Sequence, residues 1–300
     1  MNRFLIGQYG GFDDAKYERD FRDGFLGIEA CLFRHDKEID RLIQEKREQG
    51  FQVGVHFPLR AGRSAMRDAL VLSPDPRERS DAYALIEAEL SEYAAIVQPD
   101  YVLYHYPKPV ILDEAKDWSQ WRFSDNREFI DESRYSMEQF EASSEAFFRW
   151  IATQGEAYGF TPVLEFDVLN RYMTETNVVE SLLDNYPTIR ICLDTCRLYF
   201  QEAIDPSFDS RQAARKYAKY AKLVHLSTLR YAGGQVGHYK HPVLPEQNPA
   251  DGWAPIRDYL AIINERNPTV SVMFEHRSDL ISEEELDRCY SWVSELLSAR

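Results

Sequence analysis

The chain has 300 residues, of which 44% are hydrophobic and 13% aromatic, so it can bury a large core and is not a disordered chain. Its formal net charge of −15 argues mildly against a large, sequence-independent surface for nucleic acid. The apolar runs are far shorter than the roughly 20 residues of a membrane-spanning helix, and the first residues lack the pattern of a signal peptide. We therefore expect a cytoplasmic protein with no membrane partner.

Short β-rich runs alternate with longer amphipathic segments along the whole chain. The predicted strands are residues 4–10, 26–32, 52–58, 101–107, 161–166, 189–195, 223–227 and 269–276. Helical patterns lie between them and include residues 39–50, 79–97, 136–159, 177–186, 210–221, 253–266 and 282–299. Ser80, Ser136 and Ser282 each stand close before acidic residues, a pattern typical of the capped first turn of a helix.

Eight strands, each followed by a helix, predict an α/β fold with a single (β/α)8 TIM barrel over residues 1–300. A doubly wound sheet would usually have fewer strands and a glycine-rich phosphate turn, and the sequence has neither GxGxxG nor GxxxxGK[ST]. The long segments near 59–77, 108–135 and 229–252 follow strands, so we expect them to surround a pocket at the carboxyl ends of the strands.

The four cysteines lie in or beside apolar runs and show no CxxC spacing. Buried free thiols are therefore expected at these positions, rather than disulfides or a cysteine zinc site. The residues are Cys31, Cys192, Cys196 and Cys289.

Ionisable side chains stand at or near the ends of six of the predicted strands. They are His56, His105, Glu165, Asp194, His225 and Glu275, the last followed by His276. In a barrel these strand ends share one rim, where several carboxylates are costly to bury unless a cation compensates them. Two glutamates, one aspartate and one histidine suit Mn²⁺, Mg²⁺, Co²⁺ or Zn²⁺. We therefore predict one divalent metal bound by Glu165, Asp194, His225 and Glu275.

Each of these residues also has an ordinary structural interpretation. A lone carboxylate at a strand end is most often an ion-pair partner or the N-cap of the next helix. Residues His56, His105 and His241 stay open between substrate binding, a second metal and a hydrogen-bonded core role. We expect His35 and His238 at the surface, and an ion pair at Glu29.

The stretches VLEF, ICLDT, LVHLS and VMFEH, together with the element order, resemble the xylose-isomerase-like TIM barrels. That superfamily includes sugar isomerases and epimerases and apurinic-site endonucleases. In the epimerase branch, the resemblance implies that Glu165, Asp194, His225 and Glu275 bind one divalent cation. It also implies that Glu165 and Glu275 form the acid/base pair that moves a proton at a carbon beside a metal-polarised carbonyl.

The endonuclease branch adds histidines on strands three and four, a DxxH on strand six and a DxH after strand seven, which together bind up to three zinc ions. This chain keeps His56 and His105. It has Arg197 where the DxxH histidine would stand, and Tyr239 where the DxH aspartate would precede His241. The resemblance therefore implies a broken trinuclear site.

Arg197 stays protonated and has no lone pair for a metal. We expect it to hold a carboxylate ligand or to receive an anionic substrate group such as phosphate, and a salt bridge in the first turn of the following helix is an equal alternative. The predicted substrate-binding residues are His56, His105, Arg197 and His241.

Three hypotheses follow. The leading one is a metal-dependent isomerase or epimerase acting on a sugar, polyol or sugar phosphate. The second is a zinc-dependent phosphodiesterase similar to an apurinic-site endonuclease, for which the loop residues Trp118, Trp121 and Phe123 could stack on bases, although packing within the loop is the favoured interpretation. The third is a barrel without catalysis that serves as a binding or structural protein. The sequence does not determine the substrate, the metal or the oligomeric state.

Overall fold

The computed structural model describes residues 1–64 and 66–298, and within them eight parallel strands form the main sheet. These strands are β1 (Phe4–Tyr9), β2 (Gly27–Phe33), β3 (Gln52–Arg60), β4 (Tyr101–Tyr106), β7 (Thr161–Phe166), β8 (Arg190–Asp194), β9 (Ala221–Leu226) and β12 (Ser271–Phe274). They form a closed barrel in the order β1-β12-β9-β8-β7-β4-β3-β2. The predicted (β/α)8 fold and its eight predicted strands are confirmed.

The chain divides into two compact parts. The 29–190 part comprises Gln8–Phe12 and Glu29–Arg190, and the 191–300 part comprises Met1–Gly7, Asp13–Ile28 and Ile191–Arg300. The first holds β3, β4, β7 and most of β2, and the second holds β9, β12 and most of β1 and β8. A single domain over residues 1–300 stays a prediction.

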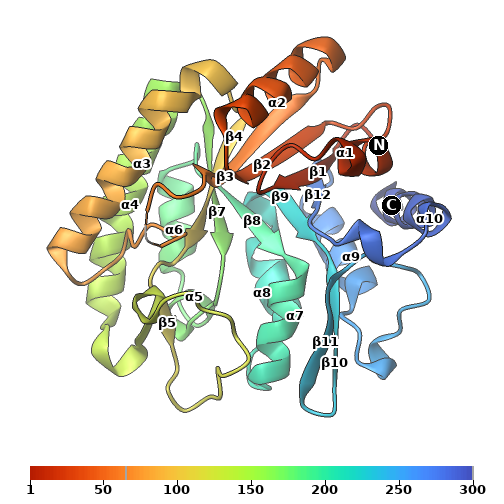
Figure 1. Cartoon of the computed structure of the whole chain (residues 1–300). Coiled ribbons are helices and arrows are strands. Elements are labelled where there is room, and N and C mark those ends of the chain that lie inside the picture. The colour runs from red at the N-terminus through yellow and green to blue at the C-terminus, as the bar shows by residue number, and fades with distance from the viewer. Residues whose placement is uncertain (65, 299–300) are drawn as a thin grey trace. The chain divides into compact units, whose positions relative to one another are not determined.

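The helices of the 29–190 part are α2 (Asp36–Gln49), α3 (Pro76–Val97), α4 (Met137–Tyr158), α5 (Arg171–Thr174) and α6 (Val178–Asn185). The two long helices, α3 and α4, lie side by side (Figure 1). Their contact is aromatic, because the ring of Tyr83 stacks on Trp150 with centroids 4.5 Å apart. In the sheet of this part, His105 lies directly opposite Glu165. Matched residues of neighbouring strands project to the same face, so these two side chains point the same way.

Two of the three predicted helix starts are confirmed. Ser136 caps α4 by accepting the N–H of Gln139, and the Ser282 hydroxyl accepts the N–H of Glu285 in the first turn of α10 (Glu283–Ser298). The start predicted at Ser80 is wrong, because α3 begins four residues earlier, at Pro76. The side chain of Asp75 accepts the N–H of Arg77 at 2.8 Å, and an aspartate cap followed by a proline in the first turn is the stronger start signal.

The other helices of the 191–300 part are α1 (Asp14–Asp20), α7 (Thr195–Ile204), α8 (Ser210–Tyr217) and α9 (Ile256–Arg266). Helix α7 follows β8 without a loop, since Asp194 both ends the strand and caps the helix. Its carboxylate accepts the N–H groups of Cys196 at 2.7 Å and Arg197 at 3.1 Å. This cap fixes where the carboxylate points.

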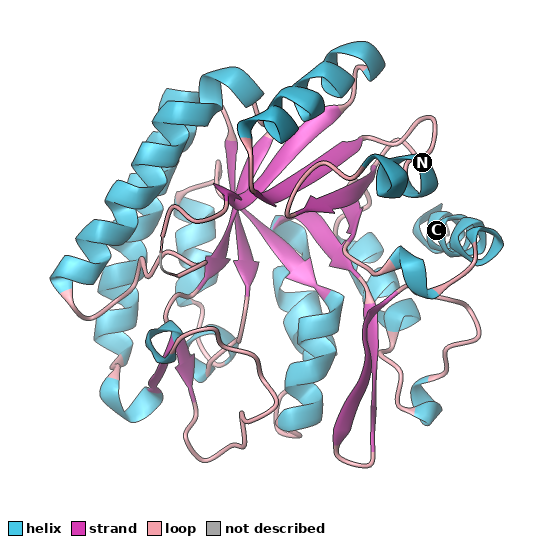
Figure 2. Cartoon of the chain, in the orientation of Figure 1, coloured by secondary structure: helices cyan, strands magenta, loops and turns pink. Residues whose placement is uncertain are grey.

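The long segments after the strands carry structure that the sequence analysis did not predict. Segment 229–252 includes most of an antiparallel hairpin of β10 (Thr228–Ala232) and β11 (Gln235–His241), which Figure 2 shows as a long two-stranded arm. Its turn residues, Gly233 and Gly234, both have positive φ, as tight hairpin turns require. In segment 108–135, the short strands β5 (Val110–Leu112) and β6 (Phe129–Asp131) pair in parallel.

The core agrees with the expectations for the cysteines. All four are free and buried. Glu29, expected in an ion pair, is buried and accepts a hydrogen bond from the Tyr101 hydroxyl at 2.7 Å. Over residues 1–64 and 66–298, no helix has the length and apolar character needed to cross a bilayer.

A buried glutamate of α3 predicts a pH-dependent stability. The carboxylate of Glu89 accepts the N–H groups of Leu59 at 2.7 Å and Arg60 at 3.2 Å, at the end of β3. Burial raises its pKa from 4.5 to about 7, against the effect of these hydrogen bonds. The pKa of Glu89 is higher in the folded protein than in the unfolded chain. Its stabilising contribution is therefore fully present below pH 4.5 and is lost as the pH rises through 7.

We therefore expect the wild type to lose up to about 3 kcal/mol of unfolding free energy relative to Glu89→Gln between pH 4.5 and 8.5. Urea unfolding at a series of pH values measures this difference. Glu87→Gln, an exposed position of the same helix, is the control. Parallel pH profiles of the wild type and Glu89→Gln would contradict the prediction.

Candidate functional site

Three of the four predicted metal ligands come together in the 191–300 part. Asp194 ends β8 and lies opposite His225 of β9, while Glu275 directly follows β12 and its N–H donates to the carbonyl of Leu226. One ligand atom from each of Asp194, His225 and Glu275 lies within 4.8 Å of the others. His225 Nδ1 is 3.5 Å from Glu275 Oε2. Asp194 and His225 are buried, and Glu275 is partly exposed.

A lysine that the sequence analysis did not single out contacts both carboxylates of this group. Lys240 of β11 donates through Nζ to Asp194 Oδ2 at 3.1 Å and to Glu275 Oε2. Burial acts to lower the pKa of Lys240, but the charges of Asp194 and Glu275 outweigh burial and raise that pKa well above its ordinary value. The two carboxylates therefore stabilise the charged form of the Lys240 side chain.

Arg197 lies in the first turn of α7, beside the same aspartate. Its Nε is 3.4 Å from Asp194 Oδ2, while its backbone N–H bonds Oδ1. One oxygen of Asp194 thus caps the helix, and the other faces Lys240 and Arg197. This position allows Arg197 to hold the carboxylate in place, and contact with a substrate anion stays a prediction.

The histidines of the hairpin lie against aromatic residues. The ring of His241 is 5.4 Å from that of Trp253, and its Nδ1 is 2.8 Å from the carbonyl oxygen of Pro242. His238 is exposed, as expected, with its ring 5.3 Å from that of Trp253. His35 is also exposed and caps α2. Substrate binding by His241 stays a prediction.

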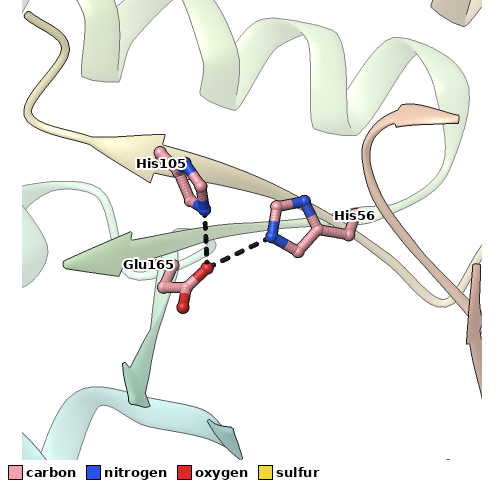
Figure 3. Close-up of side chains that lie close together, drawn as sticks. All are labelled: His56, His105 and Glu165. Atoms are coloured by element: carbon pink, nitrogen blue, oxygen red, sulfur yellow. Dashed lines mark hydrogen bonds and ion pairs between the residues drawn. The ribbon is translucent and has the colours of Figure 1, made fainter. Parts of the chain in front are cut away.

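The fourth predicted ligand, Glu165, belongs to a histidine cluster in the 29–190 part. Figure 3 shows the rings of His56 and His105 both directed at one carboxylate oxygen of Glu165. The Nε2 atoms of His56 and His105 lie 3.2 Å and 3.1 Å from Glu165 Oε2. The three residues are buried, and the two rings meet edge to face with centroids 4.9 Å apart.

The pKa values of the two histidines are shifted in opposite directions. Burial lowers the pKa of His56 more than its hydrogen bond with Glu165 raises it. Burial also opposes protonation of His105, but the charges of Asp68 and Glu165 outweigh it and raise that pKa. His105 Nδ1 is 2.9 Å from Asp68 Oδ2, so this ring bridges two carboxylates. His105 is therefore the member of the pair that carries a proton more readily.

A buried lysine adjoins this cluster. Lys108 Nζ lies 2.7 Å from Asp68 Oδ2 and 2.7 Å from Asp167 Oδ2. Burial acts to lower the pKa of Lys108, but the charges of Asp167 and Asp68 have the larger effect and raise it. The sequence analysis missed Asp68, Lys108 and Asp167, although Lys108 and Asp167 follow within two residues of predicted strands. Each part of the chain thus places one lysine between two carboxylates.

Trp118, Trp121 and Phe123 pack within segment 108–135 or bond to the polar cluster. Trp121 is buried, and its Nε1 donates to Asp167 Oδ1 at 3.3 Å. Trp118 meets Trp121 edge to face at 5.9 Å, and Phe123 lies 4.8 Å from Phe129. These contacts favour loop packing over base stacking.

Removing the buried cation predicts a large loss of stability. Lys108→Met leaves Asp68 and Asp167 buried without their shared partner, so we expect the unfolding free energy to fall by about 3–5 kcal/mol in denaturant titrations. Lys37→Met, at an exposed position of α2, should cost less than about 0.5 kcal/mol. A loss below about 1 kcal/mol in Lys108→Met would contradict the role of Lys108 as the counter-ion.

Comparison with known proteins supports the fold. No protein-family model matches the chain, and no curated protein matches it either. Solved structures do match. A zinc-bound structure of the IolI protein is 12% identical with a TM-score of 0.63, covering 99% of this chain and 98% of its own.

Two further structures match over nearly their whole length. D-psicose 3-epimerase with D-tagatose from Clostridium cellulolyticum H10 is 18% identical with a TM-score of 0.56, over 99% of this chain and 100% of its own. A family 2 AP endonuclease from Brucella melitensis is 16% identical with a TM-score of 0.56, over 98% of this chain and 99% of its own. The predicted resemblance to xylose-isomerase-like barrels is confirmed at the level of the fold.

Proposed function

We propose that the protein is a divalent-metal-dependent isomerase or epimerase acting on a sugar, a polyol or a sugar phosphate. The observation that carries this proposal is the convergence of Asp194, His225 and Glu275, whose ligand atoms lie within 4.8 Å of one another. Carboxylates and an imidazole brought together at the ends of parallel strands are a donor set that a hard or borderline divalent ion requires. Manganese, zinc, cobalt and magnesium all fit this donor set.

Glu165 is proposed as the fourth ligand. Strands β7 and β8 are neighbours in the barrel order, and Glu165 stands one residue before the end of β7, while Asp194 ends β8. The related folds offer support, because one of them was solved with zinc and another with the ketose D-tagatose. A bound cation would polarise a substrate carbonyl and stabilise the negative charge that develops on its oxygen.

The chain's own residues would move the proton. We assign the acid/base pair to Glu165 and Glu275, each of which can accept a proton from a carbon beside a carbonyl and return it. The Nε2 atoms of His56 and His105 orient the carboxylate of Glu165. The Nδ1 atom of His105 bonds Asp68, so His105 would contact a substrate hydroxyl only through Nε2, in place of its bond to Glu165. Further substrate contacts are assigned to Arg197, for an anionic group, and to His241.

Proton exchange with solvent tests the proposal. In D₂O with Mn²⁺, we expect deuterium to enter a ketose, aldose or sugar phosphate at the carbon next to the carbonyl, measured by NMR. Glu165→Gln and Glu275→Gln should each lower the exchange rate by about 10²–10⁴-fold, since each removes a general acid/base. Glu87→Gln, on the exposed face of α3, is the matched control. Exchange that is absent with all substrates and all four metals would refute the proposal.

A second candidate is a zinc-dependent phosphodiesterase. It is supported by His56, His105 and Glu165, whose ligand atoms also lie within 4.8 Å of one another and whose imidazoles suit zinc. Two observations weigh against it. The guanidinium of Arg197 lies beside Asp194, in place of a zinc-binding histidine, and burial raises the pKa of Tyr239, which replaces an aspartate ligand, to about 12.

We therefore expect a duplex with one abasic site to remain uncut by the protein with zinc or manganese, as measured on denaturing gels. Native mass spectrometry should find one metal ion per chain, because Arg197 and Tyr239 break the larger ligand set. Cleavage that disappears in both His56→Ala and His105→Ala, together with two or three zinc ions per chain, would favour the phosphodiesterase instead.

A further inference from the structure

We infer that Lys240 is a resident cation of the Asp194–Glu275 carboxylate pair, and that a divalent metal binds there only by displacing the lysine ammonium. The inference rests on the metal site of the proposed function. It adds a residue that competes with the metal. This residue makes the affinity for the metal lower than the ligand set alone would give.

The geometry carries the first step. Lys240 Nζ bonds Asp194 Oδ2 at 3.1 Å and also bonds Glu275 Oε2, so it uses one oxygen of each carboxylate. Glu275 Oε2 is also the atom that lies 3.5 Å from His225 Nδ1. The ammonium therefore contacts the same side of the group that a metal bound by these three residues would have to contact.

Charge carries the second step. Asp194, Glu275 and the ammonium of Lys240 together carry a net charge of −1, and the proposed ligand Glu165 would add a third carboxylate. A divalent ion and the ammonium would repel each other within a few ångströms if both contacted Asp194 Oδ2 and Glu275 Oε2. Arg197 already adds a further positive charge, 3.4 Å from Asp194. Simultaneous occupancy is therefore disfavoured.

The backbone carries the third step. Lys240 has φ of +56° and His238 has φ of +51°. Residues other than glycine and asparagine rarely adopt this left-handed backbone conformation. The carbonyl of Lys240 accepts the N–H of Arg277 at 2.8 Å, which ties this position to the segment that carries Glu275. Strained backbone of this kind persists only where surrounding contacts hold it. Here it directs the lysine at the carboxylates.

The Lys240 side chain can also move away from the carboxylates without a change in the barrel. The Lys240 side chain retains 17% of its solvent exposure and belongs to the β10–β11 hairpin, not to a barrel strand. Rotation of this side chain can therefore release the carboxylates while β8, β9 and β12 keep their pairing. Metal exchange then requires no opening of the barrel.

Titration with MnCl₂ tests the inference. On protein stripped with EDTA, we expect Lys240→Met to bind Mn²⁺ at least tenfold more tightly than the wild type in isothermal titration calorimetry. Lys240→Arg keeps the charge and should bind as weakly as the wild type. Lys219→Met removes an exposed lysine of the same part of the chain and controls for net charge. The metal-free Lys240→Met protein should also melt several degrees below the wild type and Lys219→Met.

The outcomes separate the two proposals. Equal Mn²⁺ affinity in the wild type and Lys240→Met, or loss of binding in Lys240→Met alone, overturns the displacement while leaving the metal-dependent function standing. Absence of binding in every variant, including Lys240→Met, overturns the metal site itself and the displacement with it.

A measurement on the wild type covers the case in which Lys240→Met does not fold. Lys240 should be acetylated by an amine-reactive ester at least threefold faster with saturating MnCl₂ than with EDTA, as read by peptide mass spectrometry, because the metal frees its side chain. Lys219 should react at the same rate in both conditions. An unchanged rate at Lys240 with Mn²⁺ bound would overturn the inference.

Discussion

Buried or partly buried carboxylates near the ends of the barrel strands require positive charge beside them, and this requirement organises both parts of the chain. Asp194 and Glu275 share Lys240, while Asp68 and Asp167 share Lys108. An uncompensated carboxylate in such surroundings would either cost several kcal/mol or take up a proton. The lysines do not come from the barrel strands, because Lys108 follows β4 and Lys240 belongs to β11. The connecting segments thus supply the cations, whereas the carboxylates come from the strand ends and, for Asp68, from the long segment after β3.

The barrel could be predicted because its signals are local. Buried parallel strands such as β4 and β9 are mostly apolar, and the amphipathic helices between them have a different period. The hairpin was missed because β11 is polar and only partly buried, so neither an apolar run nor alternation marks it. Strands β5 and β6 have three residues each, too few for any period. The helix start at Ser80 was wrong because the signal at Asp75 and Pro76 outweighs it.

The convergence of Asp194, His225 and Glu275 could also be predicted, since parallel pairing aligns the carboxyl ends of neighbouring strands. The residues that neutralise them could not. Whether Lys240 reaches Asp194 depends on the path of the hairpin and on a left-handed backbone at the lysine itself, and periodicity carries no information on either. The same holds for Asp68, which enters the histidine cluster from the long segment after β3. The ionisable residues at the strand ends could therefore be predicted, and the residues from other segments that pair with them could not.

Lys240 belongs to the hairpin, so the barrel strands and the lysine beside their carboxylates can evolve separately. Substitutions, insertions or deletions in β10 and β11 can remove the lysine or replace it with a ligand, while the pairing of β8 with β9 and of β9 with β12 stays the same. A single substitution at Lys240 would change the charge beside Asp194 and Glu275 without changing any core residue. Descendants of one such barrel could thus diverge in metal dependence while keeping identical strands, so strand motifs alone are a poor guide to metal use in this fold.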